Sequence, residues 1–400
     1  MTECSPARIL MTWEYGGALG HLARLRPVAL RLVERGHRVH LAVRPNRFGN
    51  VIPDSLGVLP VPAHRPVRER IAKPVNMADI LHNQGATDPE GLPGQIRAWR
   101  GLFDLARPDV VVMDYSPVAL LALQGYPAAT MQLGTGFAAP PAINPLPNLR
   151  AWQDHYPDRI RQTEQAVLKG LNRQLADQGE SALDCVGELF ERVDANILAT
   201  FPELDHYPQR SGGEYWGTWP DLGGETPEWP AADGPRIFAY LKPFRRLPAL
   251  LTHLRKRGWP TLVYVSGLLD TDHWQSETLK IVDQPLDMQQ VVQQCDTAIL
   301  HAGHGTTADL LLAGKPIVQL PMHVEQFHNA ANTHKIGAGR HADLDNIQSI
   351  CSAVDDVVGN PSYTDAAVKF AKRHRDHEPD RQIRKLVDRI ESMALTSTNV

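Results

Sequence analysis

Residues 301–332 read HAGHGTTADLLLAGKPIVQLPMHVEQFHNAAN, and this stretch decides the fold of the chain. A short apolar strand runs into His301, a turn with Gly303 and Gly305 follows, and Thr306 opens a helix that precedes a second apolar strand. Glycine lets a backbone approach an anion closely, and the first turn of a helix offers N–H groups without partners. The stretch therefore predicts a strand, a turn that can hold a phosphate, a helix and a second strand. The same pattern also occurs in tight connections that bind no ligand, and this is the alternative interpretation.

Polar side chains extend the pattern beyond the turn. His301 and His304 add hydrogen-bond donors, Asp309 adds an acceptor one helical turn further on, and Glu325 and Gln326 follow the second strand. This arrangement resembles the donor-binding signature of the family-1 glycosyltransferases, which have the GT-B fold and use nucleotide sugars. Their pattern is H-x-G-x-[GN]-[ST]-x-x-[ED], a strand, and then P-x-x-x-[DE]-Q-x-x-N-A. The matching positions are His301, Gly303, Gly305, Thr306, Asp309, Pro321, Glu325, Gln326, Asn329 and Ala330.

The resemblance implies both a fold and a donor site. The fold is α/β, of the GT-B type, with two doubly wound Rossmann-like domains facing a central cleft. The donor is a UDP- or dTDP-sugar, and no resident cofactor is needed. The residues that the resemblance assigns to the donor are His301, Gly303, Gly305 and Thr306 for the diphosphate, Asp309 for the ribose hydroxyls, and Glu325 and Gln326 for the sugar hydroxyls.

The whole chain has the composition of an ordinary globular protein. Its 400 residues suggest two domains, because single cores rarely grow beyond about 250–300 residues. The net charge of −4 gives no basic field for nucleic acid, and no apolar run reaches the ~18 residues of a membrane span. The N-terminus lacks the basic and apolar segments of a signal peptide. The cysteines share no close spacing and fit the reduced thiols of a cytoplasmic protein; they are Cys4, Cys185, Cys295 and Cys351.

Predicted strands and helices alternate along the chain. Continuous apolar strands joined through helices indicate a parallel sheet covered on both faces. In the first half we predict strands over 8–13, 39–43, 110–113 and 128–132, and helices over 27–35 and 117–124. A second alternation follows, with strands over 236–241 and 261–265 and a helix over 248–257.

Composition also suggests the domain boundaries. Residues 216–234 are rich in proline and glycine and lack apolar periodicity, so we interpret them as a linker. They separate an N-terminal Rossmann-like domain, 1–215, from a C-terminal one, 235–380. The resemblance makes the first the acceptor-binding domain and the second the nucleotide-sugar-binding domain. Residues 381–400 form an amphipathic C-terminal helix that can pack back on the N-terminal domain.

The first turn of the N-terminal domain contains the candidate base. The stretch from Glu14 to His21 contains three glycines, the last of them directly before His21. Ligands of such folds bind at the carboxyl ends of the strands. Gly20-His21, Pro27 and the later Gly36-His37-Arg38-Val39 are similar to elements of the family-1 transferases and of the lipid-intermediate transferase of peptidoglycan synthesis. The resemblance assigns His21 as the general base. A loop histidine that only caps a helix is the alternative.

Asp114 is the candidate partner of His21. A base needs a group that fixes its tautomer and stabilises its charged form, and Asp114 ends the apolar strand in VVVMDYSP. In the family an aspartate at this strand end often hydrogen-bonds the catalytic histidine. Two alternatives stay open. Asp114 could cap the helix that begins at Pro117, or Glu14 could orient the base instead.

The sequence departs from the family in the second domain. Where the family has a Ser-Gly-Ser-like loop, this chain has Lys242, which either brings a charge to the diphosphate or is a solvated loop lysine. The segment 284–288 lacks the aromatic residue that stacks on the base, so the choice of base stays open. Asp270 and Asp272 have the D-x-D form of metal-dependent transferases, but we interpret them as a polar loop and expect no metal site.

The hypothesis for the whole chain is an inverting, metal-independent glycosyltransferase of the hexosyltransferase type. It would move a sugar from a nucleoside diphosphate to a hydroxyl of a small-molecule or lipid acceptor. The apolar stretch 134–146 could line the acceptor pocket, make a peripheral membrane contact or be an ordinary packed loop. The rivals are a non-hydrolysing sugar-nucleotide epimerase, for which no clear set of acid/base carboxylates is found, and a non-catalytic homologue that binds a nucleotide sugar or a partner. The pair His21 and Asp114 argues against the non-catalytic homologue.

Overall fold

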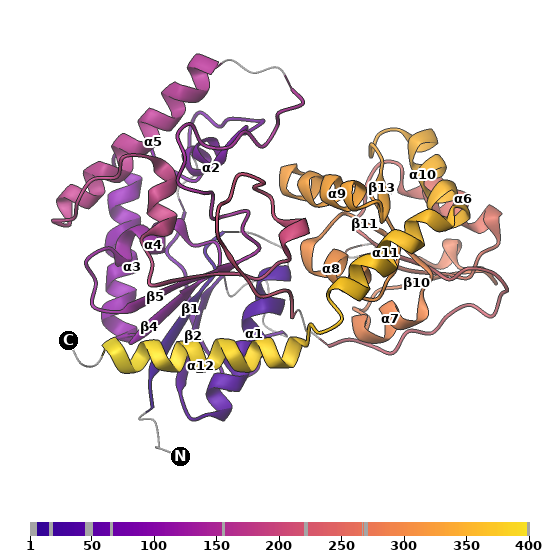
Figure 1. Cartoon of the computed structure of the whole chain (residues 1–400), viewed down its shortest axis with the longest axis horizontal. Helices are drawn as coiled ribbons and strands as arrows, with labels where there is room; N and C mark the ends of the chain where they lie inside the picture. The colour runs from indigo at the N-terminus through magenta and orange to yellow at the C-terminus, as the bar shows by residue number, and fades with distance from the viewer. Residues whose placement is uncertain are drawn as a thin grey trace. The chain divides into compact units, whose positions relative to one another are not determined.

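The computed structural model of the 400-residue chain describes residues 6–15, 19–44, 51–64, 67–153, 157–219, 223–265, 267 and 271–397. These residues form two units (Figure 1). The N-terminal unit holds the described residues of 1–201, 207–221 and 378–400, and the C-terminal unit holds those of 202–206 and 222–377. The segment 216–234, which we expected to be a linker, is therefore divided between the units. The short segment 202–206 belongs to the C-terminal unit.

The N-terminal unit is built on a parallel sheet with the order β3-β2-β1-β4-β5-β6-β7 in the described part of the chain. The strands are β1 (Arg8–Thr12), β2 (Arg38–Val43), β3 (Gly57–Pro60), β4 (Val110–Met113), β5 (Ala129–Gly134), β6 (Ala195–Leu198) and β7 (Glu214–Tyr215). The α-helices of this unit are α1 (Gly20–Glu34), α2 (Met77–Asn83), α3 (Gly91–Ala106), α4 (Pro117–Leu123), α5 (Pro157–Asp177) and α12 (Pro379–Ser397).

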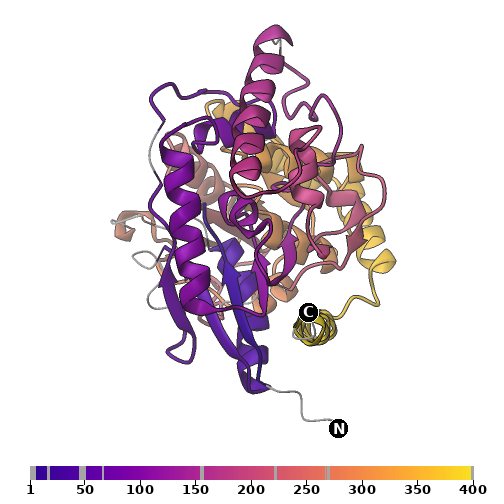
Figure 2. The same ribbon diagram turned by 90° about the vertical axis from the view of Figure 1, so that its left-hand side faces the viewer.

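Both faces of this sheet are buried, as the continuous apolar strands predict. Val110 and Val112 of β4 belong to the core cluster shared with α1 and α12, and Val111, which points to the opposite face, is fully buried as well. Helix α12 packs against α1, β4 and β5, and Figure 2 views it nearly along its axis. An ion pair between Arg35 and Asp388 at 2.6 Å ties α12 to the end of α1.

The C-terminal unit contains a second parallel sheet, with the order β10-β9-β8-β11-β12-β13 among the described residues. Its strands are β8 (Ile237–Leu241), β9 (Thr261–Val265), β10 (Leu279–Val282), β11 (Thr297–Leu300), β12 (Ile317–Gln319) and β13 (Gly339–His341). Its α-helices are α6 (Leu247–Arg257), α7 (Met288–Gln294), α8 (His304–Leu312), α9 (Val324–Ile336), α10 (Ile347–Gly359) and α11 (Pro361–Arg373). Apolar side chains of α6 and α10 pack together on one face of the sheet.

The two sheets share one topology. Numbered from its own first strand, each sheet runs 3-2-1-4-5-6, and the N-terminal sheet adds β7 at its edge. This order is that of doubly wound, dinucleotide-binding folds. The predicted fold class is confirmed, because each half of the chain forms a Rossmann-like unit.

Several helices begin earlier than the sequence patterns predict, and α1 differs most. Helix α1 starts at Gly20 and contains Pro27, which we expected at its first turn. Proline removes one intrahelical hydrogen bond, but the buried apolar side chains of Leu22 and Leu25, which precede it, hold this part of the chain in the helix. Helix α8 starts at His304 rather than at Thr306. At α1, tertiary burial therefore overrode the local signal of Pro27.

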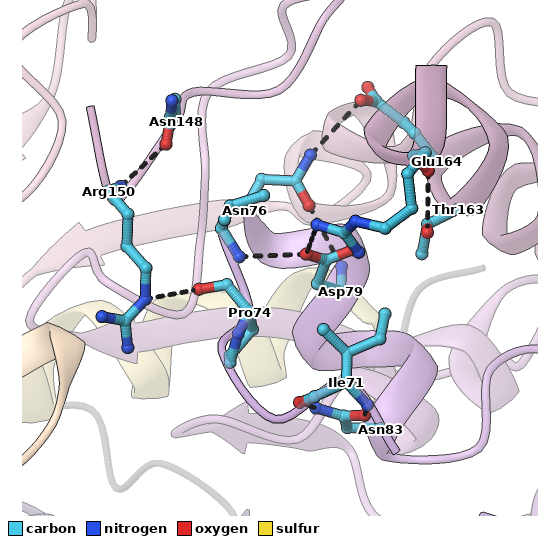
Figure 3. A network of polar contacts seen from close by, with 11 residues as sticks. Ile71, Pro74, Asn76, Asp79, Asn83, Asn148, Arg150, Thr163 and Glu164 are labelled. Carbon is cyan, nitrogen blue, oxygen red and sulfur yellow. Dashed lines mark hydrogen bonds and ion pairs between the residues drawn. The ribbon is translucent and has the colours of Figure 1, made fainter. Parts of the chain in front are cut away.

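A polar network joins α2 and α5 in the N-terminal unit (Figure 3). Asn76 caps α2, because its side chain accepts a hydrogen bond from the N–H of Asp79 at 3.1 Å. The fully buried carboxylate of Asp79 accepts the N–H of Val75 at 3.0 Å and two guanidinium bonds from Arg159 on α5. Since each buried acceptor has donors, α2 and α5 are joined without an unsatisfied charge.

The apolar stretch 134–146 is mainly a packed loop. Phe137, Ala139 and Leu146 are buried in the N-terminal unit. Among the helices in the described part of the chain, none is both long enough and apolar enough to cross a bilayer. The cysteines that the structure describes, at positions 185, 295 and 351, are free thiols, and Cys4 lies outside the described residues.

Candidate active site

Each sheet has a topological switch point, which is the place where ligands bind to doubly wound folds. In the N-terminal sheet this point lies between β1 and β4, and in the C-terminal sheet it lies between β8 and β11. Asp114 directly follows β4. Lys242 directly follows β8, and His301 directly follows β11. Asp114, Lys242 and His301 therefore lie at the carboxyl ends of the central strands of their own units.

The structure brings His21 and Asp114 together. His21 lies in the first turn of α1, and its Nδ1 is 2.9 Å from Oδ1 of Asp114, although the two groups are not aligned as a straight hydrogen bond. A proton on Nδ1 faces the carboxylate, and the neutral ring then keeps its lone pair on Nε2. The side chain of His21 is 25% exposed, whereas that of Asp114 is 3% exposed. The tautomer with the proton on Nδ1 and the lone pair on Nε2 is the one that a general base requires. Gly16 and Gly17 of the first turn lie outside the described residues.

Arg24 is the second partner of Asp114. It lies one helical turn after His21 in α1, and its guanidinium donates a short hydrogen bond to Oδ2 of Asp114. Burial raises the pKa of the Asp114 carboxyl, but Arg24 and then His21 outweigh this effect and hold the pKa below its ordinary value. Asp114 is therefore ionised, with one oxygen directed to each partner.

Two aromatic rings fix the plane of His21. The indole of Trp13 stacks on the imidazole with ring centroids 4.9 Å apart and planes inclined by 20°. Tyr115 lies at 6.4 Å with the same inclination. Tyr115 itself has a φ of +52°, which a bulky residue rarely adopts, and Gln84 donates a short hydrogen bond to its hydroxyl. Strained backbone of this kind is found at functional sites.

Glu14 caps helix α4 instead of orienting His21. Its carboxylate accepts hydrogen bonds from the N–H groups of Val118 and Ala119 at 3.0 and 3.4 Å, and from Nε1 of Trp99 at 3.3 Å. Glu14 therefore caps α4, so Asp114 is free of that task and pairs with His21. Burial raises the pKa of the Glu14 carboxyl to about 7.

His301 and Lys242 lie side by side in the C-terminal unit. Nδ1 of His301 is 2.7 Å from the main-chain oxygen of Leu320, and Nε2 is 3.4 Å from that of Lys242. The pKa of the His323 ring is lowered, first by burial and also by the charges of Lys242 and His301. Glu325 acts in the opposite direction. The ends of β8 and β11 therefore lie beside each other, and His323 at the start of α9 is near enough to interact electrostatically with Lys242 and His301.

Helix α8 begins shortly after β11 ends, and its first turn offers backbone amides. Gly303 is the N-cap residue, and a side chain there would meet open space. Gly305 and Thr306 lie in the first turn, whose N–H groups have no intrahelical acceptors. The preceding Ala302 has a φ of +56°, and its carbonyl oxygen accepts a hydrogen bond from Asn329 on α9 at 3.1 Å. Asn329 therefore holds the turn rather than a ligand.

The remaining donor-site candidates differ in their surroundings. Asp309 lies on α8, and burial raises the pKa of its carboxyl to about 8, so at neutral pH the acid form predominates and can donate a hydrogen bond. Gln326 on α9 uses its side-chain oxygen to accept the N–H of Met322 at 2.8 Å, which leaves its amide NH₂ available. Glu325 precedes it in the first turn of α9. No structural fact assigns a ligand to these three residues, and their roles stay predictions.

Sequence reasoning missed Arg24, Trp13 and Tyr115. Because we placed the start of the helix at Pro27, Arg24 was assigned to a loop. With α1 extended to Gly20, residues three apart share a face, and the spacing of His21 and Arg24 would have identified the pair. The stacking of Trp13 and Tyr115 on His21 joins two strand ends and has no local signal.

Residues 276–388 match the family model described as Erythromycin biosynthesis protein CIII-like, C-terminal domain. The match includes the turn after β11, α8 and the start of α9, which are the elements of the candidate donor site. A sterol 3-beta-glucosyltransferase from Vanderwaltozyma polyspora is 37% identical over 78 residues. That alignment spans 20% of this chain and only 6% of the length of that relative.

Solved structures resemble the whole chain. The glycotransferase of kitacinnamycin has a TM-score of 0.71 with it, covers 97% of this chain and 99% of its own, and is 19% identical. The spinosyn rhamnosyltransferase SpnG complexed with spinosyn aglycone has a TM-score of 0.68, covers 95% of this chain and 99% of its own, and is 17% identical. At these identities the likeness shows the fold, which is GT-B.

The chain therefore has the GT-B fold, and residues 276–388 in its C-terminal unit are similar to the C-terminal domain of the erythromycin biosynthesis protein CIII-like family.

Proposed function

We propose that this protein transfers a sugar from a nucleoside diphosphate sugar to a hydroxyl group of an acceptor, with inversion and without a metal ion. One observation carries the proposal. His21 stands at the switch point of the N-terminal sheet with Nδ1 beside a buried, ionised carboxylate, and Nε2 is left as a base. An acceptor hydroxyl is a poor nucleophile until such a base removes its proton.

The bonds and charges of the proposed step balance. The acceptor oxygen forms a bond to the anomeric carbon while its proton moves to Nε2 of His21. The bond between that carbon and the diphosphate oxygen breaks with its electron pair, so the nucleoside diphosphate leaves with an added negative charge. Attack from the face opposite to the leaving group inverts the anomeric carbon. Asp114 stabilises the imidazolium that forms.

The proposed donor site lies at the start of α8. The amides of Gly303, Gly305 and Thr306, the positive end of the helix dipole, His301 and Lys242 would hold the diphosphate and its growing charge. These fixed donors make a metal ion unnecessary for charge stabilisation. Asp309 would bind the ribose, and Glu325 and Gln326 would bind the sugar.

The donor and acceptor are proposed by class only. SpnG has been seen complexed with thymidine diphosphate and with spinosyn aglycone. We therefore propose a dTDP- or UDP-sugar as the donor, no resident cofactor, and a small-molecule or lipid hydroxyl as the acceptor.

The test is an incubation of the protein with UDP- and dTDP-sugars and a panel of hydroxylated small molecules. A glycosylated acceptor together with equimolar free diphosphate supports the proposal, and the coupling constant of the new anomeric proton reports inversion. Formation of an epimerised donor would instead identify an epimerase. Binding of the donor without turnover by any acceptor in the panel would favour a non-catalytic homologue.

A further inference from the structure

We infer that Arg24 is a positioning residue that keeps His21 neutral, and hence able to act as a base, by neutralising Asp114. The inference rests on the proposed function of His21, but it concerns an electrostatic relationship that can be measured without turnover. The geometry carries it. Asp114 gives Oδ1 to the imidazole and Oδ2 to the guanidinium, and both contacts are shielded from water.

A buried carboxylate with a single imidazole neighbour has a strong influence on that neighbour. An opposite charge within about 4–6 Å favours the charged form of a titratable group, and the effect is larger where water is excluded. If Asp114 had only His21 as a partner, the carboxylate would draw a proton onto the ring, and an imidazolium has no lone pair with which to accept another proton. The share of His21 that is available as a base at a given pH would then be smaller.

Arg24 removes this problem because it is a permanent cation. Its guanidinium cannot be deprotonated in a protein, and the side chain is only 10% exposed, so its charge acts on Asp114 at close range. The main-chain oxygen of Arg24 accepts a hydrogen bond from Nε1 of Trp219 at 3.1 Å, which pins this turn of α1. The carboxylate thus orients the ring of His21 without imposing a full negative charge on it.

The other groups that face His21 do not supply this compensation. In the described part of the chain they are the indole of Trp13 and the phenol of Tyr115, both stacked on the ring, while Asp114 comes from the end of β4 and Arg24 from α1 itself. Trp13 is uncharged, and a neutral phenol brings no cation. Arg24 is the cation that contacts the Asp114 carboxylate.

The experiment is a titration of the His21 ring by NMR in the full-length protein and in Arg24→Gln. The signal is assigned by its loss in His21→Gln, which is needed because the chain contains 17 histidines. In Arg24→Gln the midpoint of the His21 titration should move upward by about one pH unit. The acid limb of the kcat/KM profile should move by the same amount, so that activity lost at pH 7 is recovered near pH 9.

Matched variants separate this role from a structural one. Arg24→Lys keeps the charge and should restore the midpoint to near that of the unchanged protein. Arg31→Gln removes a cation from the same helix, where it pairs on the surface with Glu34 and Asp380, and should leave both the midpoint and the activity unchanged. If Arg24→Gln folds poorly, the comparison of Arg24→Gln/Asp114→Asn with Asp114→Asn serves instead. Without the carboxylate, the loss of Arg24 should no longer move the midpoint upward.

The outcomes of the two readouts are distinguishable. An unchanged or lowered midpoint in Arg24→Gln overturns the inference, as does an activity loss of equal size at every pH. If the midpoint moves as expected but no donor and acceptor react, the electrostatic role of Arg24 stands and the proposed transferase function fails.

Discussion

Nδ1 of His301 donates a hydrogen bond to the main-chain oxygen of Leu320 over 2.7 Å. Nε2 lies 3.4 Å from a second carbonyl oxygen, that of Lys242, but a neutral ring has only one N–H, and the shorter contact places it on Nδ1. Burial lowers the pKa of His301, so in the free protein the ring is neutral at physiological pH. In this state it cannot donate to an anion. We therefore expect His301 to gain a proton when a diphosphate binds.

The first prediction is that binding of a nucleoside diphosphate takes up a proton at His301. Since the pKa of the free imidazole is lowered and the bound anion raises it, affinity should increase as pH falls from 8 to 6, by up to about tenfold per pH unit. Calorimetry in two buffers with different ionisation enthalpies measures the uptake. In His301→Ala the part due to the ring should vanish, and in Glu325→Ala it should persist. Equal uptake in the two variants would contradict the assignment.

The second prediction separates the diphosphate from the sugar. His301→Ala should weaken the intact donor and the nucleoside diphosphate alike, and the loss of a hydrogen bond to a charged group, about 1.5–3 kcal/mol, should reduce kcat/KM by roughly 10–150-fold. Glu325→Ala should weaken only the intact donor, because its proposed partner is the sugar. Calorimetry with both ligands tests this. If Glu325→Ala weakens the diphosphate as much as the donor, the sugar does not lie beside Glu325.

The third prediction concerns the base. His21→Ala should lower turnover by roughly 10²–10⁴-fold, the usual scale of general base catalysis, and should leave donor affinity nearly unchanged. Steady-state kinetics and donor binding are measured on the same preparation. His273→Ala is the control, because His273 is exposed and its loss should not change turnover. His37→Ala is unsuitable because His37 is buried and bonded to Glu391. Turnover close to normal in His21→Ala would remove this residue from the mechanism.

The fourth prediction is that transfer activity survives a strong chelator. In the proposed donor site, the amides at the start of α8, His301 and Lys242 would serve as fixed electrostatic partners of the leaving diphosphate. Rates are compared before and after exhaustive treatment with EDTA. A complete loss of activity that magnesium or manganese reverses would contradict metal independence. It would instead indicate that Asp270 and Asp272 hold a metal ion. Asp270 itself lies outside the described residues.

The fifth prediction concerns stability and pH. Burial raises the pKa of Glu14 from an ordinary value near 4.5 to about 7, so its contribution to stability is fully present below pH 4.5 and is lost as pH rises through 7. The loss amounts to about 3 kcal/mol. Glu14→Gln keeps an acceptor for Val118 but cannot ionise, so its stability should fall less between pH 5 and pH 8.

Calorimetric unfolding of both proteins across that range measures the difference. The exposed Glu34→Gln serves as the control and should follow the unchanged protein. Asp309, whose pKa burial raises to about 8, adds a decline of the same sign in both proteins and cancels in the comparison. A Glu14→Gln variant whose stability declines as steeply as that of the unchanged protein would refute the prediction.

Local patterns were enough to predict the strands that form the centre of each sheet. β4 and β9 have the predicted bounds and β11 ends directly before His301 as predicted, because each is a short, continuous apolar run that can be buried only inside a parallel sheet. The positions of Asp114 and His301 followed directly, since each residue is the first polar one after such a strand. Each lies at the carboxyl end of a central strand of its own sheet, which is a consequence of parallel topology.

Helix boundaries were less well predicted where local and tertiary preferences disagree. Pro27 has a strong local preference for the first turn of a helix, yet the burial of Leu22 and Leu25 extends α1 back to Gly20. The error hid Arg24. Similarly, nothing in the sequence near Glu14 shows that it caps α4, because its partners Val118 and Ala119 lie more than a hundred residues further on.

The sequence by itself therefore determined the class of fold and which polar residues end the central strands, because apolar runs and glycine turns are local and periodic. Only the tertiary structure decided the electrostatics of the candidate site. Whether Asp114 is ionised, which nitrogen of His301 holds the proton, and what neutralises the charge beside His21 depend on burial and on atoms from distant segments. Distances of a few ångströms between such groups set their charge states, and those distances exist only once the chain has folded.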